Sequence, residues 1–244
     1  MLILATIVSF FPFIGVYLWL RNGVSKEETH RKLCDKAFGQ GVLCIIPVSA
    51  FSAISSIALN LSGIESSNPL LYRALHTLIV LALSEEIAKC AMSLRFMKKR
   101  GGSYSWLDIV VIFVVVATGF GVFESIIYAF GASIPVVLVR GICVPHVAYG
   151  FIVGYFYGKG LKTGNNGAKW IGFAITLLIH WLYDFSLSEE FTSLNDNLVF
   201  IPLLLALAEI VLAIVLIVFT RKASKQEKYT EPIPETSADL KGIT

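Results

Sequence analysis

The segment Leu83-Ser84-Glu85-Glu86-Ile87-Ala88-Lys89 places two adjacent carboxylates and a lysine inside a long apolar stretch of the chain. A charge at the centre of a bilayer costs roughly 2.5 to 3.5 kcal/mol on insertion scales, so such residues require a polar interior. The chain of 244 residues is 56% hydrophobic and 15% charged, and its mean hydropathy is +0.74. These values are far too apolar for a soluble domain of this size. The segment therefore indicates a polar site within an integral membrane protein.

Apolar runs long enough to cross the hydrocarbon layer recur along the whole chain. Seven can be placed, near residues 2–20, 39–62, 70–96, 106–130, 133–158, 168–187 and 197–220. We therefore expect an all-α fold, a polytopic membrane bundle of seven transmembrane helices that forms one domain over residues 1–220. The motifs described below lie within residues 84–185 of it. Residues 221–244 become rich in Pro, Glu and Thr, which predicts a disordered cytoplasmic tail.

The distribution of basic residues predicts the orientation, because cytoplasmic connections are enriched in Lys and Arg. Basic residues cluster after the first, third and fifth spans and at the start of the tail, whereas the opposite connections carry mainly Glu and Asp. This pattern predicts an N-terminus outside and a C-terminus in the cytoplasm. The net charge of +3 is spread over these short clusters and gives no support for nucleic-acid binding. The cysteines have no metal-site or disulfide spacing and are expected to be reduced; they are Cys34, Cys44, Cys90 and Cys143.

The paired glutamates are the strongest chemical signal in the sequence. Residues three and four apart share one face of a helix, so Lys89 can reach both Glu85 and Glu86. Two adjacent carboxylates in a low dielectric do not both ionise freely, which provides a base and a potential acid side by side. The alternative is an ion pair that only fixes helix packing, but a simple pair would need one Glu. The motif therefore favours chemistry.

A third carboxylate, Glu124, lies in the next apolar run. It follows Gly119 and Gly121, where the missing side chains let a neighbouring helix or a substrate approach closely. Glu124 either supports the site or neutralises Arg140 on the following span, and the sequence leaves these two interpretations open.

Two histidines lie on the later spans. His146 precedes Gly150 by one turn, so its imidazole is expected to face a gap with room for a reacting group. His180 and Asp184 are also one turn apart, the spacing at which a carboxylate orients an imidazole. With the paired glutamates, these residues supply the base and the oxyanion donors that acyl hydrolysis by water requires.

These motifs resemble the PrsW family of intramembrane proteases, relatives of the CAAX prenyl proteases. All of them occur in the family's order on consecutive spans, which is more specific than any one motif. Ser125 follows Glu124 where the family usually has Asn, which leaves the polar support of that helix in question. The matching pieces are Ser84 to Lys89, Gly119 to Glu124, Val139 through His146 to Lys159, and Leu178 to Phe185.

The resemblance implies an endopeptidase of the bacterial cytoplasmic membrane that cleaves a membrane-anchored single-pass protein, such as an anti-sigma factor. It implies water activation by Glu85 and Glu86, and a place for Glu124 and His146 around the water or a metal. His180 would be an oxyanion partner or ligand that Asp184 orients. The catalytic set is thus Glu85, Glu86, His146 and His180, and the supporting set is Lys89, Glu124, Arg140 and Asp184.

The cofactor and two other functions stay open at this point. We expect no tightly bound metal, with zinc as the alternative; its ligands would then be Glu124, His146 and His180, with one position left for water. A non-catalytic scaffold like the APH-1 subunit of gamma-secretase would lack the paired glutamates that this chain has. A proton-coupled carrier could also use buried Glu, His and Lys, but the sequence shows no inverted repeat. Expected partners are the lipid bilayer and the protein substrate, without nucleic acid; the sequence does not fix an oligomeric state.

Overall fold

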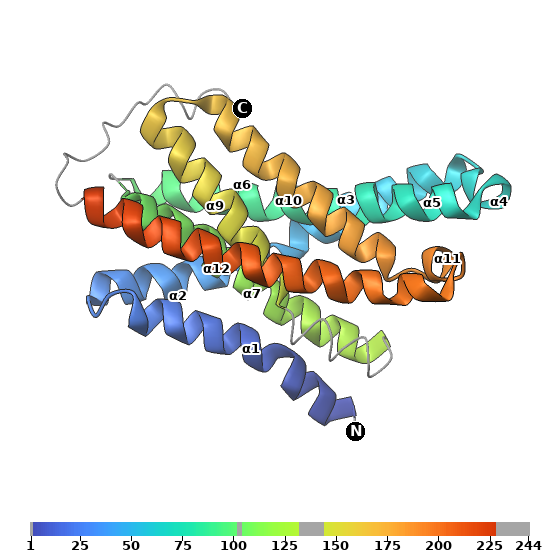
Figure 1. Cartoon of the computed structure of the whole chain (residues 1–244), viewed down its shortest axis with the longest axis horizontal. Helices are drawn as coiled ribbons and strands as arrows, with labels where there is room; N and C mark the ends of the chain where they lie inside the picture. The colour runs from blue at the N-terminus through green and yellow to red at the C-terminus, as the bar shows by residue number, and fades with distance from the viewer. Residues whose placement is uncertain (1, 102–103, 132–143, 228–244) are drawn as a thin grey trace.

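The computed structural model describes residues 2–101, 104–131 and 144–227. All regular structure in these ranges is helical (Figure 1), which confirms the all-α prediction. Among the described residues, three helical stretches have the length and apolar composition needed to cross a membrane, namely Glu28–Leu61, Trp106–Tyr128 and Ile201–Phe219. The protein is therefore a multi-pass membrane protein by composition and helix length, and the count of seven spans stays a prediction.

The helices follow the predicted apolar runs. In chain order they are α1 (Leu2–Gly23), α2 (Glu28–Leu43), α3 (Ile45–Leu61), α4 (Ile64–Ser67), α5 (Pro69–Leu75), the π-helix η1 (His76–Leu83), α6 (Ser84–Arg100), α7 (Trp106–Gly131), α9 (Pro145–Thr163), α10 (Asn166–Ser186), α11 (Glu189–Thr192), the 3-10 helix η2 (Asp196–Phe200) and α12 (Ile201–Glu227). The first half of the span expected at 133–158, with Arg140 and Cys143, lies outside the described residues.

Two boundaries differ from the prediction. Helix α12 continues to Glu227, so the tail predicted from residue 221 begins with helix; residues 228–244 lie outside the described part. The extension has a simple cause, because the segment Arg221 to Glu227 consists mostly of good helix formers. The connection expected over residues 21–38 is also mostly helix, since it contains the start of α2.

Helix α2 has a buried face that the basic residues obscured in the sequence. Cys34 and Ala37, at helical spacing, are 0% exposed and belong to the core of the bundle. His30 is buried on the same face. Its Nε2–H donates to the Leu20 carbonyl oxygen over 2.9 Å, so α2 is fixed against the end of α1.

Helix α7 is the central helix of the bundle. Every residue from Ile109 to Phe120 is buried, as expected for a helix that is apolar on all sides. Glycines allow its neighbours to approach closely. A Cβ on Gly119 would lie 3.2 Å from the Gly41 Cα of α2, and one on Gly150 would lie 2.8 Å from the Val114 Cα. The gap expected beside His146 at Gly150 is therefore filled by the backbone of α7, which corrects that prediction.

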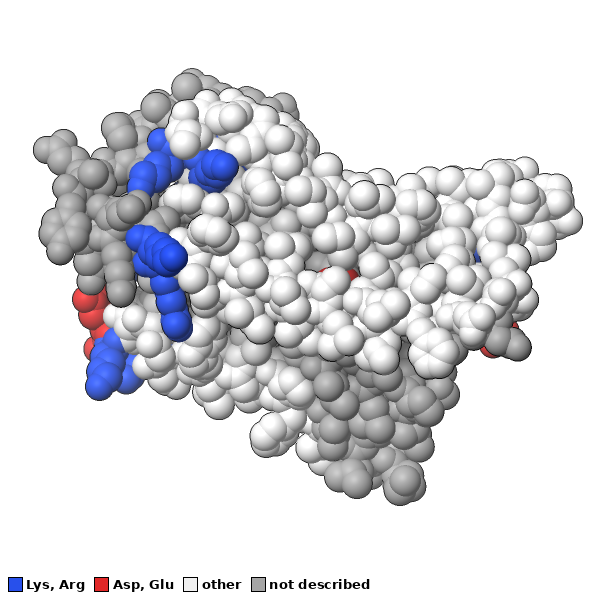
Figure 2. Space-filling view, in the orientation of Figure 1, with Lys and Arg blue, Asp and Glu red and all other residues white. Residues whose placement is uncertain are grey.

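The connections gather at two ends of the bundle. Figure 2 shows Lys and Arg side chains over one end and an almost uncharged midsection. At that end the Arg221 guanidinium lies 5.4 Å from the Trp19 ring. At the opposite end Arg73 donates twice to Glu190, each time over 2.9 Å. The basic connections thus share one end, as the orientation rule requires, and the side that this end faces stays a prediction.

Helices α5 and α6 are joined without a break by the π-helix η1. Such segments are rare and occur frequently at functional sites. Ser84 donates its hydroxyl to the Val80 carbonyl oxygen over 2.7 Å, and Ser52 of α3 does the same over 2.7 Å. The start of α6, where the paired glutamates follow, is therefore held against α3.

Substituting Gly119 tests the close crossing of α2 and α7. Gly119→Ala is expected to lower the free energy of unfolding by about 1–3 kcal/mol, because the new methyl group meets the backbone of α2. Gly39→Ala, in α2 with nothing within 4 Å of its added Cβ, serves as the control. It should be neutral or stabilise by up to about 1 kcal/mol. Denaturant unfolding of the detergent-purified variants measures both, and equal effects would contradict the crossing.

Candidate active site

Polar side chains from four helices meet inside the bundle. None of them is more than 8% exposed, although they lie far apart in the sequence. They are Glu85, Glu86 and Lys89 of α6, Glu124 of α7, His146 of α9, and His180 and Asp184 of α10. The structure thus brings together every predicted site residue except Arg140, which lies outside the described residues.

Lys89 is at the centre of this group. Its Nζ lies 2.6 Å from Glu86 Oε1 and 3.8 Å from Glu85 Oε2, so it reaches both carboxylates as the spacing predicted. The same Nζ is 3.0 Å from His146 Nδ1, and it is 5.0 Å from the centre of the Phe120 ring. The ammonium group is therefore surrounded by oxygen, nitrogen and aromatic electron density.

The contacts of His146 fix its tautomer. An ammonium group has only hydrogens to donate, so His146 Nδ1 accepts from Lys89. The ring proton is then on Nε2 and is donated to Glu124 Oε2 over 2.5 Å. Glu124 therefore supports the site through His146; the other interpretation, neutralisation of Arg140, concerns a residue outside the described ones. Both nitrogens of His146 are engaged in this way.

The start of α9 explains how His146 reaches the interior. Val144 precedes the helix in the left-handed region, with φ 41°, and Pro145 occupies the first turn. Such a backbone conformation is rare for a β-branched residue, and strain of this kind concentrates at functional sites. Proline suits the position because it lacks the N–H that a first turn cannot pair. His146 follows directly, in the first turn of the helix.

His180 has carboxylates on both sides of its ring. Its Nδ1 lies 2.8 Å from Glu86 Oε1, and its Nε2 lies 3.2 Å from Asp184 Oδ2. The pairing with Asp184 agrees with the predicted spacing of one turn. The contact with Glu86 comes from another helix, and it makes Glu86 a partner of both Lys89 and His180.

Two buried atoms of this polar group make no hydrogen bond to the described residues, although one of them, His180 Nε2, lies within ion-pair distance of Asp184 Oδ2. They are Glu85 Oε2 and His180 Nε2, which lie 3.6 Å apart. One ligand atom each from Glu85, His146 and His180 lies within 4.8 Å of the others, a spacing that can hold a metal ion. Orphaned polar atoms of this kind call for an occupant, such as water or an ion. An imidazole pair with a carboxylate is also a usual donor set for zinc.

The charge balance of the described site favours a cation as well. Glu85 and Glu86, both buried, share the ammonium group of Lys89. Buried carboxylates need compensation, and a divalent ion supplies it. The donor set differs from the one expected for zinc, because Glu85 takes the place of Glu124, whose Oε2 is bonded to His146.

The sequence interpretation missed two residues next to the site. Tyr149 of α9 stacks on His180, and its hydroxyl donates to Glu209 of α12 over 3.1 Å. Glu209 is a carboxylate inside an apolar run, so the argument used for Glu124 would have found it. Tyr149 follows His146 by about one turn and carries no comparable signal.

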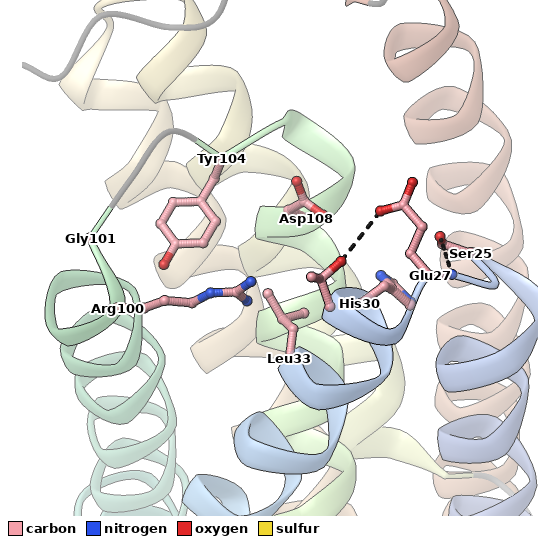
Figure 3. A pocket seen from close by; sticks show the side chains of 9 residues that line it. Ser25, Glu27, His30, Leu33, Arg100, Gly101, Tyr104 and Asp108 are labelled. Atoms are coloured by element: carbon pink, nitrogen blue, oxygen red, sulfur yellow. Dashed lines mark hydrogen bonds between the residues drawn. The ribbon is translucent and has the colours of Figure 1, made fainter.

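A separate cavity of about 360 Å³ lies at the basic end of the bundle (Figure 3). Polar residues of α2, α6 and α7 line it, and within it Thr29 donates to Glu27 over 3.3 Å. Arg100, which lines the cavity, is roughly 22 Å along α6 from Glu85 at 1.5 Å per residue. The cavity is therefore distinct from the buried polar group.

Comparison with protein families agrees with the resemblance in the motifs. Residues 29–220 match the family described as PrsW family intramembrane metalloprotease. No curated protein and no solved structure gives a match. The match covers most of the chain and includes all of the buried polar group. The protein therefore belongs to the PrsW family of intramembrane metalloproteases.

Proposed function

We propose that this protein hydrolyses a peptide bond of a membrane-anchored protein, with water activated at the buried polar group. The observation that carries the proposal is the meeting of Glu85, His146 and His180 within 4.8 Å inside the bundle. A buried base beside two imidazoles is what hydrolysis by water requires. The paired glutamates argue against a non-catalytic scaffold.

The chain's own residues support each proton transfer. Glu85 Oε2 is a buried acceptor without a hydrogen-bond partner among the described residues, so it can take a proton from the attacking water. Without a metal, an N–H at His180 Nε2, 3.6 Å from that oxygen, can donate to the oxyanion that forms; a metal held by this nitrogen would supply that stabilisation instead. Glu85 then passes the proton to the departing amine. Glu86 holds the other nitrogen of His180 and keeps the ring oriented.

Zinc is the metal that we propose for this site, held by Glu85, His146 and His180. When bound, it would polarise the carbonyl group of the scissile bond as a Lewis acid. Since both nitrogens of His146 are engaged, binding there would compete with Lys89 or Glu124.

We further propose a single-pass membrane protein, of the anti-sigma-factor kind, as the substrate, and the bacterial cytoplasmic membrane as the location. Support comes from the depth of the site within a bundle whose outer surface carries exposed large hydrophobic side chains, such as Ile54, Leu204 and Val211. A substrate in the bilayer can reach such a site without crossing water. Comparing membrane proteomes with and without this protein would identify a single-pass protein that accumulates uncut.

Removing the charge of Glu85 is expected to abolish cleavage. Glu85→Gln should lower the cleavage rate of a co-expressed membrane substrate by about 100-fold or more, because the proton acceptor is lost. Glu86→Gln and His146→Ala should have similar effects. Glu65→Gln, at an exposed carboxylate of α4, is the matched control and should cleave like the wild type. Immunoblots measure both the product and the amount of inserted protease; wild-type rates in Glu85→Gln would overturn the proposal.

Zinc content distinguishes a ligand set that contains Glu85 from one that contains Glu124, each together with His146 and His180. The purified wild type should contain zinc, and Glu85→Gln and His180→Ala should lose it. Glu124→Gln should retain zinc with an affinity lower by about 10–100-fold, since Glu124 acts through His146. Elemental analysis and chelator competition measure this. Loss in Glu124→Gln with retention in Glu85→Gln would favour the set without Glu85, and a metal-free, chelator-resistant active enzyme would exclude zinc.

The seven-span topology, with the N-terminus outside, can be tested by cysteine labelling. In a variant without native cysteines, we expect Ser66→Cys in α4 to react with a membrane-impermeant maleimide in intact cells. Lys98→Cys, near the end of α6, should react only after the membrane is permeabilised. Both side chains are exposed, so a difference reports the side of the membrane. The reverse pattern would invert the proposed orientation.

A further inference from the structure

The two imidazoles of the site share an aromatic neighbour. The Tyr149 ring stacks on His180, with 4.7 Å between ring centres and 27° between planes. It meets His146 edge-on at 5.7 Å and 79°. The two imidazoles themselves are 5.5 Å apart at 80°. Tyr149 is only 1% exposed, so its ring is held by the surrounding packing while it contacts both histidines.

A carboxylate of another helix holds this ring in place. The Tyr149 hydroxyl donates to Glu209 Oε1 over 3.1 Å. Glu209 is 2% exposed and lies within α12, whose segment Ile201–Phe219 has a mean hydropathy of 3.0. A carboxylate in such a segment is costly, and residues of this kind serve function by default. In Figure 1, α12 runs alongside α9 and α10, the helices that carry the two histidines.

We propose that Tyr149 and Glu209 form a positioning pair that sets the distance and angle between His146 and His180. The stacked ring limits where His180 can lie, and the bond to Glu209 limits how the ring itself can tilt. Catalytic and metal-binding groups must be held to within about 0.5 Å, so an anchored ring in contact with both histidines has a direct effect on the site. The pair also makes α12 part of the active site. This inference rests on the proposed function.

Glu209→Leu tests the pair, because it removes the anchor and keeps the tyrosine. We expect the 15N-imidazole NMR signals of His146 and His180 to shift, with those of His30 and His76 unchanged. We expect kcat to fall and zinc affinity to weaken, each by about 10–100-fold, with little change in KM. Tyr149→Phe should act in the same direction. Glu209→Gln keeps an acceptor oxygen and should recover most of what Glu209→Leu loses.

Tyr155→Phe is the matched control, since it removes a hydroxyl from the same helix beside Trp106, away from the histidines. It should resemble the wild type in all three measurements. If Glu209→Leu lowers only the unfolding temperature and leaves the imidazole signals, kcat and zinc affinity unchanged, the pair is merely structural and the inference is overturned. If the wild type cleaves no substrate but the imidazole signals still respond to Glu209→Leu, the proposed function fails and the positioning pair stands.

Discussion

The Lys89 ammonium group is a buried positive charge that joins Glu85, Glu86 and His146 inside the bundle. Its Nζ contacts Glu86 and His146 directly, and Glu86 passes the connection on to His180. One charge on α6 therefore orders groups on α9 and α10. Removing one partner of a buried charge is far more costly than removing an exposed one, so these helices cannot separate without leaving unpaired charges in an apolar medium.

The tight packing around α7 serves the same polar group. Gly119 lets α2 come close on one side, and Gly150 lets α9 come close on the other. In a bilayer, helices gain little from excluding lipid, so small residues at crossings are a principal source of close packing. The approach of α9 to α7 also brings His146 to Glu124, which lies one to two turns after Gly119 on the central helix.

What the sequence predicted depended on local spacing. Lys89 with its two glutamates, and His180 with Asp184, are within one turn of each other, so helix geometry alone paired them. The contact of Glu86 with His180 and that of Glu124 with His146 join different helices, and no spacing rule specifies such pairs. The buried face of α2 was missed because its apolar positions are interleaved with Lys and Arg. Tyr149 gave no signal, since an aromatic residue in an apolar run is ordinary.

The π-helix η1 lies between α5 and α6 in one continuous helix, and the parts before and after it each contact α10. Before it, the Ala74 carbonyl accepts from Trp181 of α10; after it, Glu86 binds His180 of the same helix. A π turn holds more residues than the 3.6 of an α turn, so each residue in η1 advances by less than 100°. The segment η1 therefore sets the direction in which the paired glutamates point relative to Ala74. Deleting one residue from it would rotate Glu85 and Glu86 about the helix axis while Ala74 kept its contact with α10.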